Sequence, residues 1–346
     1  MLSSLILPST SFADNSTTFQ PGIDLSTQTV WDFSQNSYQF GADKTANPGA
    51  DLQTPEALAI QVLNGEKPKD STVLNMAQGG TVFETGEGKI GVGLLASYAN
   101  LTVNGDIGFT GLGYEAMAVM VVEASDLTIN GALTIDAFST TSPVLPLILS
   151  DSNVSIDSIR IKSGGSLAVG GVPGLPHSGA TFVMASGGSL TSENVFLEVR
   201  EDNKGPIYGL NVDDAEVHFS NFNANLVNKY GGIAIGSMSN SNVKFDSVAL
   251  NASCEEGSVT GFTGTGGMLT ISGGTIDLSS QLGDAKAVEV GSSQLDNLEV
   301  NVKASNGFAQ GLHFVDDTVI NNVSLTVEGS NGYIYGIETA GYDGKG

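Results

Sequence analysis

Apolar residues recur along the chain at intervals of about 26 residues. The two clearest copies are the pentapeptides 101–105 and 127–131, with the sequences LTVNG and LTING. The first position of this motif is apolar at Leu101, Leu127, Val154, Leu190, Val217, Val243, Leu269, Leu295 and Val319. Seven of the eight steps are 24 to 27 residues long, and one is 36 residues long. A fixed period in this range is typical of solenoids, propellers and repeat arrays.

A second apolar position precedes each copy by seven residues. It is occupied by Leu94, Met120, Leu147, Val183, Leu210, Gly236, Phe262, Val288 and Leu312. Residues two positions after the first motif position are also mostly apolar. They are Val103, Ile129, Ile156, Ser192, Phe219, Phe245, Ile271, Asn297 and Asn321. Alternation with a period of two indicates strands with one buried face.

Short polar residues and glycines follow the motif. Asn104 and Gly105 stand at the end of the first copy, and Asn130 and Gly131 at the end of the second. These residue types favour turns, since glycine and asparagine tolerate a positive φ. A further apolar run, such as 133–135, comes next. We therefore predict a strand, a turn at a fixed place and another strand in every repeat.

The fold class predicted from this pattern is all-β, a right-handed parallel β-helix with rungs of about 26 residues. Equivalent strands of successive rungs would pair about 4.8 Å apart, and equivalent apolar side chains would stack in the core. Crossovers between parallel strands are almost always right-handed. An antiparallel β-meander or sandwich is the alternative, because Asn-Gly is also a strong hairpin signal.

The domain organisation follows the repeat. Residues 1–13 resemble the end of a signal peptide, with a short apolar run and a small-x-small cleavage pattern at 11–13. We assign residues 14–56 to an N-terminal cap and residues 57–346 to the β-helical repeat region, with a helix starting at Thr54 as the rival interpretation there. The long step contains a Gly- and Pro-rich insertion at 169–180, which we expect to leave the rod as a loop. Because the chain stops part-way through a rung, we expect it to be a fragment truncated at the C-terminus.

The composition is acidic and poor in cysteine. The formal net charge is −24, with 13 Lys and Arg against 37 Asp and Glu. Nucleic-acid binding requires basic clusters, so we expect no nucleic-acid partner. The carboxylates are interpreted as a solvated outer face, with weak calcium binding as the alternative. The single cysteine, Cys254, allows no intrachain disulfide and is interpreted as a filler residue in a turn.

No catalytic, metal or cofactor-binding residues are assigned from the sequence. The three histidines, His177, His218 and His313, lie in different repeats without further ligands at zinc spacing. Glycosidases require two carboxyl groups within about 5 to 9.5 Å. The acidic pairs 213–214 and 316–317 are four rungs apart, and Arg160 and Arg200 show no clear acidic column beside them. The expected cofactor is therefore none.

The repeats from Leu101 to Val319, the signal-like start and the acidic, Cys-poor composition resemble the passenger region of Gram-negative autotransporters. The resemblance implies export through the outer membrane by a C-terminal barrel that this sequence lacks, and display at the cell surface or secretion. It implies adhesion or self-association, with a host or bacterial surface ligand or a second copy as partner. A secreted carbohydrate-active enzyme, either lyase or glycosidase, and a passive spacer are the alternatives.

Overall fold

The fold consists entirely of β-strands in the part of the chain that the structure describes. The structure is a computed structural model, and it describes residues 23–24, 30–33, 39–41, 57–63, 71–76, 82–85, 91–113, 117–139, 144–165, 179–201 and 203–339. The strands are β1 (Ile23–Asp24), β2 (Val30–Phe33), β3 (Gln39–Gly41), β4 (Ala57–Leu63), β5 (Thr72–Met76), β6 (Val82–Thr85), β7 (Gly91–Ser97), β8 (Asn100–Asn104), β9 (Ile107–Gly113), β10 (Met117–Glu123), β11 (Asp126–Ser139), β12 (Val144–Gly165), β13 (Ala180–Val199), β14 (Ile207–Asp213), β15 (Glu216–Tyr230), β16 (Ile233–Glu256), β17 (Val259–Ile271), β18 (Gly274–Ser280), β19 (Ala285–Asp296), β20 (Leu298–Ala304), β21 (Ala309–Phe314), β22 (Thr318–Asn321), β23 (Ser324–Gly329) and β24 (Ile334–Thr339).

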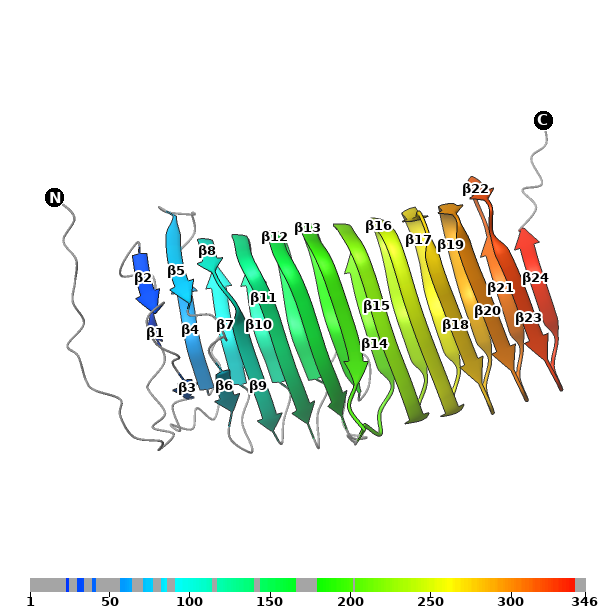
Figure 1. Cartoon of the computed structure of the whole chain (residues 1–346), viewed down its shortest axis with the longest axis horizontal. Helices are drawn as coiled ribbons and strands as arrows, with labels where there is room; N and C mark the ends of the chain where they lie inside the picture. Colours follow the sequence, from blue (N-terminus) through cyan, green and yellow to red (C-terminus); the bar gives the residue numbers. More distant parts are fainter. Residues whose placement is uncertain are drawn as a thin grey trace.

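The strands form a parallel β-solenoid. Figure 1 shows them side by side along a rod, from β1 and β2 at one end to β24 at the other. Each rung contains three extended segments, such as β7, β8 and β9, and each segment pairs with its equivalent in the neighbouring rungs. We name the three resulting sheets the first, second and third walls, after β7, β8 and β9. Every pairing among the described strands is parallel, for example β12 with β13, so the antiparallel alternative is wrong.

The core column of the first wall is confirmed over its whole predicted length. Leu94 pairs with Met120, and the same register continues through each predicted member to Leu312. The one exception to apolar character, Gly236, lies against the ring of Phe262, where a Cβ atom would come within 2.6 Å of that ring. The glycine therefore makes room for a large neighbour in the next rung.

The core column of the second wall is confirmed from Leu101 to Leu269 and is wrong beyond it. Leu269 pairs with Ser293, while Leu295 pairs with Ile271 in the adjacent column. The cause is a register shift between Gly264 and Met268, where the next rung is two residues shorter. The slip carries on to the final predicted member, Val319, which is 51% exposed instead of buried.

The corner between the first and second walls is a column of left-handed residues that the repeat analysis missed. The residue three positions before each motif has positive φ, at Tyr98, Ala124, Asp151, Gly187, Asp214, Asn240 and Gly266. The predicted turn after the motif is left-handed at Gly105 and Gly131, with φ of 106° and 155°. In β12, β13, β15 and β16 the chain stays extended at that place, so a turn there in every repeat is wrong.

The solenoid extends toward the N-terminus beyond the repeats with a clear motif. Strands β4, β5 and β6 pair with β7, β8 and β9, as expected for a first rung at 57–88. Strands β1, β2 and β3, within the predicted cap region, pair in turn with β4, β5 and β6. The predicted signal segment 1–13 and the helix start at 54–56 lie outside the described residues. Residues 166–178 of the insertion also lie outside them, yet Val154 and Leu190 on its two sides still pair.

The interior is filled by stacked side chains. In the middle rungs four rings from all three walls meet, with Phe222 and Phe245 centroids 4.9 Å apart and Phe245 and Phe262 centroids 5.2 Å apart. Small polar residues occupy the corners. Buried Asn228 donates from Nδ2 to the carbonyl of Gly205 at 2.9 Å, and its Oδ1 accepts from Asn203 at 3.0 Å. These bonds satisfy polar groups where the strands bend, which keeps the rung shape uniform.

Candidate functional site

The outer face of the third wall has a continuous column of polar side chains. Successive rungs pair these residues with one another, so they point outward at the same position of each rung. We name this the polar column: Thr110, Asp136, Lys162, Glu198, Asn225, Asn251, Asp277, Asn301 and Thr326. At about 4.8 Å per rung, the column is roughly 38 Å long. Its members are hydrogen-bonding groups that a long, polar ligand could contact repeatedly.

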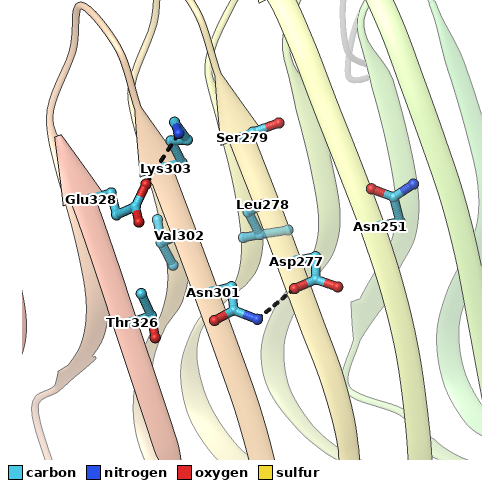
Figure 2. Close-up of a pocket in the computed structure, with 9 residues that line it drawn as sticks. All are labelled: Asn251, Asp277, Leu278, Ser279, Asn301, Val302, Lys303, Thr326 and Glu328. Carbon is cyan, nitrogen blue, oxygen red and sulfur yellow. Dashed lines mark hydrogen bonds and ion pairs between the residues drawn. The ribbon is translucent and has the colours of Figure 1, made fainter. Parts of the chain in front are cut away.

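A shallow hollow lies at the C-terminal end of the polar column, on strands β16, β18, β20 and β23. Its volume is about 250 Å³. Figure 2 shows the side chains and backbone that line it: Asn251, Asp277, Leu278, Ser279, Asn301, Val302, Lys303, Thr326 and Glu328. Leu278 and Val302 are buried, so the floor is backbone and apolar atoms while the rim is polar.

The carboxylates of the hollow are already engaged. Asn301 donates from Nδ2 to Oδ1 of Asp277 at 2.8 Å, and Lys303 Nζ lies 3.1 Å from Oε2 of Glu328 (Figure 2). The two carboxylates belong to rungs two apart, which places them roughly 10 Å apart along the axis before any lateral offset. Paired carboxylates for glycoside hydrolysis lie closer than this. The hollow is therefore suited to binding through hydrogen bonds.

A basic and aromatic patch lies beside the N-terminal half of the same column. The Cζ atom of Arg160 lies 5.4 Å from the ring centroid of Phe196 in the next rung. The Cζ atom of Arg200 lies 5.4 Å from the ring centroid of Phe138. Both are cation–π contacts, within the usual limit of about 6 Å. The patch brings together the only two arginines of the chain.

Two carboxylates of the polar column pair with basic residues of this patch. Arg200 forms an ion pair with Asp136, and Lys162 Nζ lies 3.4 Å from Oε1 of Glu198. The interpretation that Arg160 and Arg200 have no acidic column beside them is thus wrong. The column was hidden because the 36-residue step separates Lys162 from Glu198 in sequence, although the two residues pair in the sheet. An alignment of repeats that allows for the insertion would have found it.

The histidines do not converge. His218 Nε2 lies 3.0 Å from Oδ2 of Asp246, whose Oδ1 lies 2.9 Å from Lys244 Nζ. The hydrogen bond from Lys244, and more weakly that from His218, lowers the pKa of the Asp246 carboxyl. His313 lies 3.6 Å from a carboxylate oxygen of Glu289. Each of these histidines thus has one carboxylate neighbour in the next rung, which the sequence did not reveal, and His177 lies outside the described residues.

Neither the acidic pairs nor the cysteine forms a reactive cluster. Asp213 stacks on Ser239, and Ser239 on Thr265, which keeps the pair 213–214 away from 316–317, as expected. Cys254 is buried within β16, where burial raises the pKa of its thiol. Its Sγ donates to the carbonyl of Gly231 at 2.9 Å, so it is a core residue of a strand and not part of a turn. Over the described residues, no group of three His, Cys, Asp and Glu side chains could hold a metal ion.

Comparisons with known proteins supply no further assignment. The chain matches no protein-family model, and comparison with curated proteins and with solved structures returned no match. None of the described residues belongs to a helix that is long and apolar enough to cross a membrane. The fold and the geometry of its outer face are therefore the basis for assigning function.

Proposed function

We propose that this chain is a β-helical passenger, secreted or displayed on the surface of a Gram-negative bacterium, and that it acts by adhesion or self-association without catalysis. The polar column carries this proposal. It offers donors and acceptors at a constant spacing on an open wall, which suits repeated weak contacts with an extended ligand or with another copy. A rod also holds such a face away from the cell.

The architecture supports the export part of the proposal. Each strand pairs with the adjacent rungs only, for instance β16 with β14, β15, β17 and β18. Stability in such a fold is approximately a sum of nearest-neighbour terms, so rungs can fold one upon another as they emerge. The single cysteine leaves no disulfide loop to close before transport. Protease treatment of intact cells that express the full natural gene tests this: we expect cleavage of the chain without lysis, and protection would contradict surface display.

Binding is tested with variants of the polar column. The double variant Asn251→Ala/Asn301→Ala removes two donors from the hollow, whereas Ser237→Ala/Thr270→Ala makes matched changes on the outer faces of the other two walls. The wild-type chain is applied to host-matrix and bacterial surface panels, and sedimentation velocity measures self-association. We expect the column variant alone to lose retention or association. Equal losses in both variants would contradict a role for this face.

A secreted carbohydrate-active enzyme is the second candidate, because the structure places Asp136 and Glu198 beside Arg200 and Lys162. Basic residues next to carboxylates are the groups that polysaccharide cleavage would use. The two functions are distinguished by incubating the chain with a polysaccharide panel and measuring the length of the products. Release of shorter chains, lost when one of these carboxylates is replaced, would establish the enzyme and contradict the adhesin.

A further inference from the structure

The basic and aromatic patch differs from the rest of the outer face in its charge. The chain carries a formal net charge of −24, yet Arg160, Lys162 and Arg200 gather on the third wall within two adjacent rungs. Two of their charges are matched by Asp136 and Glu198. The patch therefore has an excess of one positive charge on an otherwise acidic molecule.

The unmatched charge belongs to Arg160. Its guanidinium contacts the ring of Phe196, and no carboxylate among the described residues forms an ion pair with it. Both Arg160 and Phe196 are exposed, and the Phe196 side chain is 37% accessible. An exposed guanidinium beside an exposed ring offers one bidentate site for an anion and one flat apolar surface.

We propose that this patch binds an acidic polysaccharide whose acidic groups are uronic-acid carboxylates. The carboxylate of one sugar pairs with the guanidinium of Arg160, and the apolar face of a sugar ring packs on Phe196. The chain of sugars continues along the polar column, where its hydroxyl groups donate to Glu198 and Asn225. The inference rests on the proposed function, because it assumes that the molecule binds through the outer face of the third wall.

The same charges argue against other polyanions. Nucleic acids and heavily sulfated chains carry one or more charges on every unit, and their binding requires several free basic residues. Here Lys162 and Arg200 already have carboxylate partners. Asp136 and Glu198 would repel closely spaced anions, whereas they accept hydrogen bonds from hydroxyl groups. A polymer with at most one carboxylate per sugar and many hydroxyls fits this arrangement.

The experiment measures the affinity of the full chain for a galacturonic acid oligomer by titration calorimetry. The methyl ester of the same oligomer is the matched ligand without charge, and a sulfated oligosaccharide of equal length tests the kind of anion. The variants are Arg160→Gln, Arg160→Lys and Phe196→Leu. Lys303→Gln is the matched control, because it removes an exposed cation at the other end of the same wall. The far-UV circular dichroism and urea midpoint of each variant verify its fold.

We expect Arg160→Gln to weaken binding of the free acid at least about tenfold, while Lys303→Gln leaves it unchanged. Arg160→Lys should restore it only in part, since an ammonium does not form the bidentate pair. Phe196→Leu should weaken the acid and the ester alike, and the ester should be insensitive to Arg160→Gln. Tighter, Arg160-dependent binding of the sulfated chain would overturn the assignment to carboxylates.

Two further outcomes separate this inference from the proposed function. If the wild-type chain and Arg160→Gln bind the uronate oligomer equally or not at all, while the wild-type chain is still retained on surface panels, the inference is overturned and the proposed function stands. If the chain binds no oligomer, no surface and no second copy, both are overturned. Shortening of the oligomer would overturn the proposed non-enzymatic function.

Discussion

Replacement of Phe245 by alanine should destabilise the middle rungs more than any outward substitution nearby. Phe245 is fully buried, and its ring contacts three others, with centroid distances of 6.0 Å to Phe219, 4.9 Å to Phe222 and 5.2 Å to Phe262. Truncation of a buried phenylalanine costs about 3 to 5 kcal/mol through lost transfer free energy and the cavity left behind. The three ring contacts place the expected loss in the upper part of that range.

The matched control is Phe196→Ala. Phe196 points outward from the third wall, and its main described contact is with Arg160, worth about 0.5 to 1 kcal/mol. Urea denaturation followed by circular dichroism measures the unfolding free energy of both variants. Hydrogen exchange should show lost protection in β15, β16 and β17 for Phe245→Ala, while β10 and β11 keep theirs, because rungs contact only their neighbours.

The reasoning fails if the two phenylalanine variants lose similar stability. A loss under about 1.5 kcal/mol for Phe245→Ala would mean that its ring is not enclosed by the rungs on either side. A uniform loss of protection along the rod would contradict the local, nearest-neighbour description of its stability.

Three further substitutions test the corners and the surface charges. Gly188→Ala should cost more than about 2 kcal/mol, because φ is +73° and a Cβ atom would lie 2.1 Å from the carbonyl oxygen of Ser152; its urea midpoint measures this. Asn228→Ala should cost about 1 to 3 kcal/mol by leaving buried carbonyls without donors, measured in the same way. Lys244 lowers the pKa of Asp246, so the ionised carboxyl stabilises the fold above its unfolded value of roughly 3.9, and this is lost as the pH falls through the lowered pKa. Because this carboxylate is 42% exposed, the advantage of the wild type over Asp246→Asn should stay below about 1 kcal/mol and disappear under pH 4 in thermal melts.

Each of these has a matched comparison. At Gly273 the nearest atom to an added Cβ is 3.7 Å away, so Gly273→Ala should leave the urea midpoint close to that of the wild type. Asn251 bonds on an exposed face, and Asn251→Ala should change stability by less than about 0.5 kcal/mol. An equal effect in either control, or an advantage over Asp246→Asn that grows below pH 4, would contradict the stated causes.

The apolar period was sufficient to predict the solenoid and most of its register. The first-wall column from Leu94 to Leu312 could be read directly, since one buried residue per rung must be apolar and only glycine replaces it. The second-wall column went wrong after Leu269, because a rung that is two residues shorter moves the next leucine into the neighbouring column. Apolar letters alone do not distinguish two core columns that are two residues apart.

The corners and the candidate site were harder to predict. The left-handed corner is formed by tyrosine and alanine at Tyr98 and Ala124 as well as by Asp, Asn and Gly, so the turn signal is weak in the first copies. The polar column was not recognised because outward residues vary freely in type. Its members Lys162 and Glu198 become neighbours only when the insertion is left out of the repeat.

Distances between spin labels on one outward column of the second wall test the stacking of rungs most directly. Thr102, Thr191, Lys244 and Thr270 belong to one such column through successive pairings. In a Cys254→Ser background, cysteines at Thr102 and at one of the other three sites carry nitroxides, and double electron–electron resonance measures their separation. The account predicts backbone separations of roughly 14, 24 and 29 Å, which rise by about 4.8 Å for every rung, including the 36-residue step. Separations that do not increase with the number of rungs would contradict it.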